Sequence, residues 1–313
     1  MKMSKKKKVF IIVSAVVIFL FLITLGPNPV RTVRNIGKIK YIIDLLTGQR
    51  TEEEDIGVEG LIEAFVDKRN PGIYRKYAAS KLGHSMKDAK AVEPLIGVLQ
   101  DKTEHELIRA EAAFTLGLIG DKRAIEPLLE ALNDESYEVQ IGVLRALNDF
   151  KDERIIKPLI AVTKGEDSKK RAIAAKGLTI DTPEAIATLI GLIREDTYFS
   201  SKYVSVRALG ETRTKNEEAF QVLLEVMDGK YGDRDLLIST AILSLGKIGD
   251  KRAVEPLLKI LKEDRYFYHE AAIALGDLGD KRAIEPLMKR MEEKKNKAHI
   301  MKDLNEAYRK LTK

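Results

Sequence analysis

The sequence predicts an all-α protein: an α-solenoid of about eight helix-pair repeats, preceded by a single transmembrane helix. Three observations support this prediction. One ten-residue stretch recurs almost unchanged as GDKRAIEPLL, GDKRAVEPLL and GDKRAIEPLM, at 120–129, 249–258 and 279–288. Apolar residues recur at helical spacing through most of the chain, and an uncharged apolar run lies near the N-terminus. Repetition at this scale is typical of solenoids, in which neighbouring units bury a continuous core.

The composition narrows the functional classes. The 313 residues are 33% charged and 6% aromatic, with no Cys and no Trp, which suits a helical array. The absence of Cys excludes disulfides, thiolate nucleophiles and Cys-ligated zinc. Nine Lys or Arg and no acid stand within residues 1–40, so the chain from Tyr41 onward has a net charge of −3. We therefore expect no nucleic-acid binding through a phosphate-neutralising surface.

The N-terminal part divides into a basic flank at 1–8, a transmembrane anchor at 9–25 and a juxtamembrane segment at 26–50. The 17 residues from Val9 to Leu25 carry no charge and would span roughly 25 Å as a helix, at the short end for a bilayer. A cleaved signal peptide is the alternative. We prefer a retained anchor because Gly26-Pro27 follows the run, and proline disfavours cleavage at that point.

The charges that flank the anchor predict its orientation. Lysines are denser before the run than after it, so we expect a single-pass membrane protein with a cytoplasmic N-terminus and the repeat domain on the outer face. The following segment, Arg31–Leu46, is amphipathic and basic. It forms either a helix on anionic headgroups or a cap on the first repeat. Thr51 and Glu54 have capping-box spacing and begin the repeat domain, 51–313.

Eight units follow when the chain is aligned on the proline of the recurring stretch. Their spacings are 34, 33, 31, 30, 34, 34 and 30 residues. Around each aligned position, apolar residues stand at i, i+3, i+4 and i+7, with Thr163 as the exception, so each unit contains a helix with one buried face. The aligned positions are Gly60, Pro94, Pro127, Pro158, Thr188, Val222, Pro256 and Pro286.

Local signals place the ends of these helices. Asp121 and its equivalents Asp250 and Asp280 are expected N-caps, and the glycine before each one ends the preceding helix. The proline is expected beyond the first helical turn, where it would kink the helix. A second helix with paired alanines, such as Ala112 and Ala113, completes the unit and allows close packing between neighbouring units.

The unit has a D-x-x-A-h-x-P-L-h-x-h-L first helix and an A-A-x-x-L-G second helix. It resembles the HEAT-like repeat of the phycobilisome-lyase type, over about Thr51 to Lys313. The resemblance is clearest in the third, seventh and eighth units. It implies a curved stack of helix pairs with a concave face lined by second helices. The last segment, 297–313, suits a terminal cap.

Enzymes that resemble this repeat suggest an alternative function. The resemblance to deoxyhypusine hydroxylase implies His-Glu pairs as iron ligands at one position of four second helices, and His269-Glu270 matches that position. The other units lack such a pair there, and His105-Glu106 stands five residues early. Since an iron centre needs several converging ligands, we expect no metal and no cofactor, and a structural or surface role for His269.

Two further enzymatic resemblances find little support. The bilin lyases would imply an aromatic-lined tetrapyrrole pocket, but the candidate aromatics stand mostly in turns, where they would fill gaps between repeats. The alkylpurine glycosylases would imply a basic, aromatic cleft, which a chain body of net charge −3 without Trp does not favour. The candidate aromatics are Tyr198, Phe199, Tyr203, Tyr266, Phe267 and Tyr268.

The predicted function is a membrane-anchored scaffold that binds another protein through its concave face, rather than an enzyme. A basic ladder on the second helices supplies the candidate contacts, with Gln140 interrupting it. An alternative, which we favour for the ladder itself, is that each member pairs with an acid of a neighbouring turn, such as Asp101 or Asp134. The members of the ladder are Arg75, Arg109, Arg171 and Lys202.

Overall fold

The computed structural model describes residues 57–232, 234–263, 266–294 and 298–312. Within these ranges the chain forms sixteen α-helices and no strand. No helix in this part is long and apolar enough to cross a bilayer. The predicted anchor at 9–25, the juxtamembrane segment and the capping box at Thr51 lie outside the described residues.

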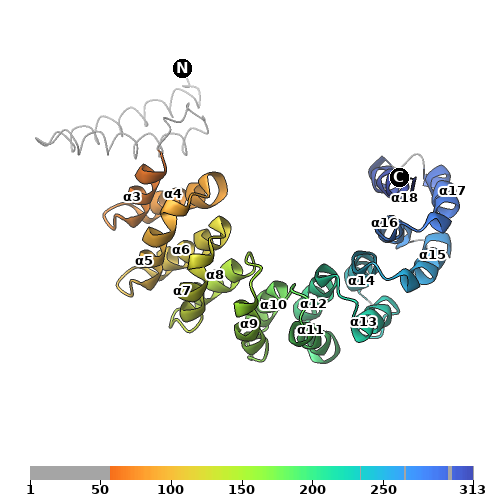
Figure 1. Cartoon of the computed structure of the whole chain (residues 1–313), viewed down its shortest axis with the longest axis horizontal. Coiled ribbons are helices and arrows are strands. Elements are labelled where there is room, and N and C mark those ends of the chain that lie inside the picture. Colours follow the sequence, from red (N-terminus) through yellow and green to blue (C-terminus); the bar gives the residue numbers. More distant parts are fainter. Residues whose placement is uncertain (1–56, 233, 264–265, 295–297, 313) are drawn as a thin grey trace, which may run out of the picture.

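The helices form eight consecutive pairs in two rows along an arc (Figure 1). The first helices make the outer row: α3 Val58–Val66, α5 Val92–Gln100, α7 Ile125–Ala131, α9 Ile156–Thr163, α11 Pro183–Glu195, α13 Glu217–Met227, α15 Val254–Glu263 and α17 Ile284–Lys294. The second helices make the inner row: α4 Gly72–Lys81, α6 Glu106–Ile119, α8 Tyr137–Leu147, α10 Ser168–Gly177, α12 Phe199–Thr212, α14 Asp235–Ile248, α16 Tyr268–Leu278 and α18 Ala298–Thr312. The α-solenoid is therefore confirmed, with the second helices on the concave side.

The recurring stretch forms a capped turn between pairs. Gly120 ends α6 in the left-handed conformation at φ 75°. The Asp121 side chain then accepts a hydrogen bond from the Arg123 N–H at 2.9 Å. Asp250 and Asp280 do the same for Arg252 and Arg282. These caps and helix ends confirm the sequence prediction.

The expected position of the proline, beyond the first helical turn, was wrong because an unpredicted 3₁₀ turn takes up the first residues. In the third pair this turn spans Lys122–Ala124, and α7 begins only at Ile125. Pro127 is therefore the third residue of the α-helix, inside the first turn. Amides of the first turn have no intrahelical acceptor, so the proline removes no helical hydrogen bond and gives no reason for a kink.

Small residues let the inner helices approach one another closely. A Cβ added at Gly117 would lie 2.5 Å from the Cα of Ala146, and one at Gly246 would lie 2.6 Å from the Cα of Ala274. Each glycine is on one inner helix and its neighbour is on the next. Neighbouring outer helices contact one another less closely than neighbouring inner helices, so close packing along the inner row accounts for the curvature.

The C-terminal helix α18 completes the eighth pair. Leu304 and Leu311 are buried, and Ala307 packs at the glycine of α16, Gly276. Its opposite face carries exposed charges, including Lys302 and Arg309. The predicted amphipathic end of the repeat array is thus present, as the second member of a helix pair.

Candidate protein-binding face

The inner row exposes large apolar side chains on both sides of its middle, in the first, second and sixth pairs. The second residue of an inner helix is Ile73 in α4, Leu107 in α6 and Leu236 in α14, and these are 55%, 39% and 51% exposed. Seven residues later, two helical turns along the same face, α6 has Phe114 and α14 has Leu243. Both are half-buried and lie outside the hydrophobic core. Because the outer row covers the other side of these helices, this face looks into the hollow of the arc.

The middle of the same face is polar and basic. At the second helical position, α8, α10 and α12 carry Glu138, Lys169 and Ser200, all exposed. At the position two turns later they carry Arg145, Lys176 and Arg207, of which the first two are exposed and the third is partly exposed. These three cations were not predicted as contact residues, although their regular spacing of 31 residues is visible in the sequence.

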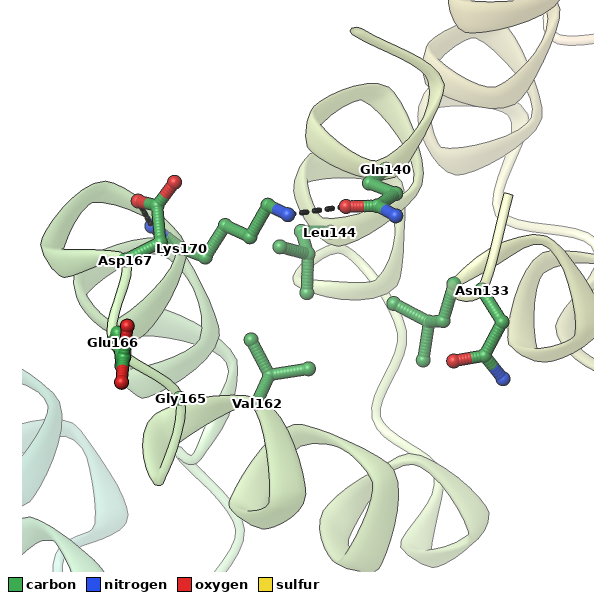
Figure 2. A pocket seen from close by; sticks show the side chains of 9 residues that line it. Asn133, Gln140, Leu144, Val162, Gly165, Glu166, Asp167 and Lys170 are labelled. Carbon is green, nitrogen blue, oxygen red and sulfur yellow. Dashed lines mark hydrogen bonds between the residues drawn. The ribbon is translucent and has the colours of Figure 1, made fainter. Parts of the chain in front are cut away.

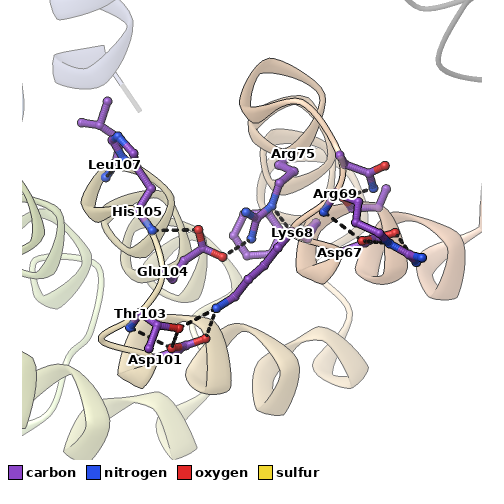
Figure 3. A network of polar contacts seen from close by, with 12 residues as sticks. Asp67, Lys68, Arg69, Arg75, Asp101, Thr103, Glu104, His105 and Leu107 are labelled. Carbon is purple, nitrogen blue, oxygen red and sulfur yellow. Dashed lines mark hydrogen bonds and ion pairs between the residues drawn. The ribbon is translucent and has the colours of Figure 1, made fainter.

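The predicted basic ladder lies at the turn edge and is occupied by contacts within the chain. Figure 3 shows its first member, Arg75, which is 3% exposed. Arg75 donates a hydrogen bond to the Phe65 carbonyl at 2.6 Å and another to the Glu104 carboxylate at 2.7 Å. Burial acts to raise the pKa of Glu104, but the hydrogen bonds from Arg75 and from the His105 N–H outweigh it and lower the pKa.

The next members repeat this arrangement. Arg109 is buried and donates both terminal nitrogens to Asp134, in the turn of the next pair. Arg171 donates to Asp196 at 2.8 and 3.1 Å, again one pair onward. Burial alone would raise the pKa of Asp134, but hydrogen bonds from Arg109, from Lys102 and from a backbone amide lower it well below its usual value.

The favoured alternative for the ladder, pairing with acids of neighbouring turns, is thus present in the structure. Asp134 is the partner of Arg109 as named, whereas Asp101 accepts a hydrogen bond from Thr103 and pairs with Lys68 at 2.7 Å rather than with a ladder arginine. Lys202 ends the series with a hydrogen bond to the Tyr231 carbonyl at 3.4 Å. Binding of a partner by the ladder stays a prediction, for which Arg171 and Lys202 offer partly exposed surface and Arg75 and Arg109 offer almost none.

A cavity of about 290 Å³ opens where the ladder is interrupted. Gln140 takes the arginine position in α8, and its side chain donates to the Asp134 carbonyl and accepts from Lys170 (Figure 2). Leu144 and Val162 form the apolar floor, with polar residues at the rim. The cavity lies between the third and fourth pairs, and its volume is just below the range usual for ligand pockets.

The His269-Glu270 pair does not assemble a metal site. His269 Nδ1 lies 2.8 Å from Glu270 Oε2, so the two side chains contact one another. His105 is at the start of α6, where its Nδ1 accepts the Leu107 N–H at 3.2 Å. In the described ranges, no group of three or more His, Asp or Glu side chains could hold a metal ion. The residues present there do not fit the iron centre that the hydroxylase resemblance implied.

Comparison with known proteins identifies the repeat. Three segments match the HEAT repeats family, at residues 58–148, 102–162 and 231–299, and together they cover more than half of the chain. This chain belongs to the HEAT repeat family. The match overlaps the helix pairs that the recurring stretch defined, and it leaves the fifth pair and parts of the fourth and sixth pairs uncovered.

Two kinds of curated protein are similar to this HEAT repeat chain. The phycocyanobilin lyase subunit alpha of Picosynechococcus sp. is 26% identical over 208 residues, which is 61% of this chain and 76% of the lyase subunit. Deoxyhypusine hydroxylase-B of Oryza sativa is 28% identical over 224 residues, or 68% of each chain. Deoxyhypusine hydroxylase of Phaeosphaeria nodorum reaches 39% identity over 106 residues, but this covers only 30% of that enzyme.

Solved structures show the same fold. The X-ray structure of YibA from Escherichia coli superimposes with a TM-score of 0.53 at 22% identity, covering 85% of this chain and 99% of YibA. The complex of CpcE and CpcF of phycocyanin lyase from Nostoc sp. gives a TM-score of 0.50 at 22% identity, covering 84% of this chain and 97% of that one. These likenesses support the α-solenoid and carry no statement about activity.

Proposed function

We propose that this HEAT repeat chain is a scaffold that binds another protein along its inner face. The observation that carries the proposal is the exposed surface of the second helices, where Ile73, Leu107 and Leu236 stand free of the core. Large apolar side chains left exposed along one concave surface are candidate contacts for a partner. A preformed curved face also binds its partner with little loss of conformational entropy, because the face is already ordered before binding.

The comparisons support a protein partner without naming one. The phycocyanin lyase of Nostoc sp. is a complex of two chains, CpcE and CpcF. By analogy, this chain would assemble with another polypeptide. Contact through the edge ladder would add to the inner face at Arg171 and Lys202, where the ladder keeps some exposed surface.

The proposal includes attachment to a membrane. Its support is the uncharged run at 9–25, with lysines before it. Such an anchor would hold the repeat domain near membrane or envelope proteins and raise its effective concentration toward them. The predicted orientation places the repeat domain on the outer face.

Site-specific photo-crosslinking in living cells tests the scaffold. A photoreactive residue in place of Leu243 on α14 samples the inner face, and one in place of Lys259 on α15 is the matched outer control. We expect a reproducible adduct with one protein from the inner position only. Adducts formed equally from both positions, or from neither, would contradict binding along the inner face.

An enzyme related to the lyases or the hydroxylases is the second candidate, since those proteins are the curated relatives. If the chain acts as a hydroxylase-like enzyme through His269 and Glu270, the purified protein should contain stoichiometric iron that His269→Ala removes. If it handles a bilin, added phycocyanobilin should show a changed visible absorption spectrum. The scaffold proposal expects neither, and elemental analysis with absorption spectroscopy separates the two.

A further inference from the structure

We infer that the middle of the inner face binds an acidic segment of a protein partner, with apolar side chains on both sides of the acidic run. The surface involved is the central basic patch, defined as Arg145, Lys176 and Arg207. This inference rests on the proposed scaffold function and specifies the chemistry of its partner.

The central basic patch is regular. Its three residues occupy the same position in α8, α10 and α12, the inner helices of three consecutive pairs, and they are 31 residues apart. Packed helices lie about 8–10 Å apart. The three cations therefore form a row of roughly 20 Å across the hollow of the arc.

The patch is poorly neutralised by the chain itself. Across the described residues, Arg145 and Lys176 have no ion-pair or hydrogen-bond partner. Arg207 lies 3.6 Å from Glu211, which Lys247 also approaches at 3.9 Å. Both contacts to the Glu211 carboxylate are long and exposed, so Glu211 neutralises the charge of Arg207 only weakly.

Other exposed arginines of this chain, in contrast to Arg145, form ion pairs within the chain. The arginines of the inter-pair turns each pair with the aspartate two residues earlier, and each also reaches a glutamate of the preceding pair. They are Arg123, Arg154, Arg252 and Arg282. The chain thus pairs the arginines at its edge and leaves two of the three cations of the central basic patch without a partner.

The helix in the middle of the patch adds further positive charge. α10 reads SKKRAIAAKG and contains no acid. Its Lys169 and Lys170 lie over the Tyr137 ring, at 5.5 and 4.8 Å from the ring centroid. Two acids share this inner face, Glu138 at the start of α8 and Glu211 beside Arg207 in α12. The local charge is therefore positive, although the chain beyond residue 40 is net acidic.

The surroundings of the patch favour a protein over a nucleic acid. Phe114 on α6 and Leu243 on α14 take the patch position in the pairs on either side, so apolar surface flanks the cations. Single-stranded nucleic acids need aromatic side chains that stack on bases beside the basic groups, and this position offers none in α8, α10 or α12. An extended peptide advances about 3.3 Å per residue, so acids at every third residue would match the row.

Fluorescence anisotropy with the purified full-length chain tests the inference. The probe is a labelled peptide with Glu at every third position and Leu at both ends. The same peptide with Lys in place of Glu is the first control, and a labelled single-stranded RNA is the second. The test variant combines Arg145→Glu, Lys176→Glu and Arg207→Glu. Its matched control makes the same charge change on outer helices, through Lys157→Glu, Lys259→Glu and Lys289→Glu.

We expect the acidic peptide to bind, with affinity that falls as salt rises. The inner triple variant should weaken binding by about tenfold or more, because three attractive contacts become repulsive, and the outer triple variant should change it less than about twofold. Five of the six altered side chains are exposed and Arg207 is partly exposed, so the circular dichroism and thermal midpoints of both variants should stay close to those of the parent.

Three results would overturn the inference: no binding of the acidic peptide, equal loss in both triple variants, or tighter binding of the RNA. The scaffold proposal is judged separately. If crosslinks form from the inner face in cells but the acidic peptide does not bind, the scaffold proposal is supported and the inference of an acidic partner is wrong. Peptide binding without inner-face crosslinks would contradict the scaffold instead.

Discussion

Arg109 and Asp134 show how this solenoid uses charge inside its fold. Both side chains are almost fully buried, and the arginine of one pair donates both terminal nitrogens to the aspartate in the turn of the next pair. A buried ion pair of this kind sets the register between neighbouring units more than it adds net stability. The loss of one partner, however, leaves the other charge buried and uncompensated. The contact therefore fixes how two consecutive pairs stack.

Removing the arginine should be costly. We expect Arg109→Ala to lower the free energy of unfolding by about 3–5 kcal/mol, because Asp134 would stay buried without its main partner. Lys102→Ala is the matched control, since Lys102 contacts the same carboxylate but its side chain is 68% exposed. Urea denaturation followed by circular dichroism measures both, and equal effects of the two changes would contradict this account.

Acid should weaken the same contact. The pKa of Asp134 is lowered in the folded protein, so its contribution is fully present above the pKa of the unfolded chain and is lost as pH falls toward the folded value. We expect the stability difference between the parent and Asp134→Asn to be constant above about pH 5 and to narrow steadily as the pH falls from there to about pH 2. Urea titrations at several pH values measure the difference, and a gap independent of pH would show that the charge of Asp134 does not matter.

The size of the residues at the contacts between helices determines how closely neighbouring helices pack. The inner row uses Gly117, Gly210, Gly246 and Gly276 at equivalent positions, each facing a small residue of the next inner helix. The outer helices contact one another less closely, so the inner row is shorter than the outer row and the stack bends. Curvature places the second helices inside, and with them the exposed apolar side chains and the central basic patch.

Two glycines of this chain should respond in opposite directions to the same substitution. Gly246→Ala would place a Cβ 2.6 Å from Ala274, and we expect a loss of about 1–3 kcal/mol from overpacking. Gly97→Ala, in the outer helix α5, meets nothing within 4 Å and should gain about 0.4–1 kcal/mol. Thermal unfolding compares the two, and a tolerated Gly246→Ala would show that the inner row is not closely packed there.

The whole molecule is an open arc. The middle of its inner face is basic, and apolar side chains lie on both sides of this basic region. We propose that the arc is held at a membrane. The solenoid leaves its inner face available along its length, unlike a compact domain that closes around a core. A tether at the N-terminus would present this face to neighbours at the membrane. The function then depends on the assembled arc, since no single pair contains the full surface.

Deleting residues 9–25 tests the tether. We expect the full-length chain to stay with membranes after alkaline carbonate extraction, and the deletion variant to move to the supernatant, because the run supplies the apolar area that a bilayer would bury. Protease added to intact cells should digest the repeat domain if the predicted orientation holds. A full-length chain that is already extracted by carbonate would contradict the anchor.

The stacking of pairs explains why the position of the ladder could be predicted and its environment could not. Arg109 stands four and seven residues before Ala113 and Leu116, so it shares their buried stripe, a signal that was present in the sequence. Arg145 stands five residues after the ladder position of its helix, Gln140, and therefore about 140° around the helix from it. Both positions are basic and periodic, and periodicity alone does not say which one faces solvent.

The sequence by itself determined the eight pairs, their caps and their buried faces, because these depend on local signals: apolar spacing, Asp caps and left-handed glycines. Only the tertiary structure decided that the ladder arginines are engaged within the chain, that Gln140 leaves a gap, and that Arg145, Lys176 and Arg207 line the hollow. The physical reason is that these features depend on contacts between neighbouring pairs. Those contacts are set by how closely the inner and outer rows stack in three dimensions.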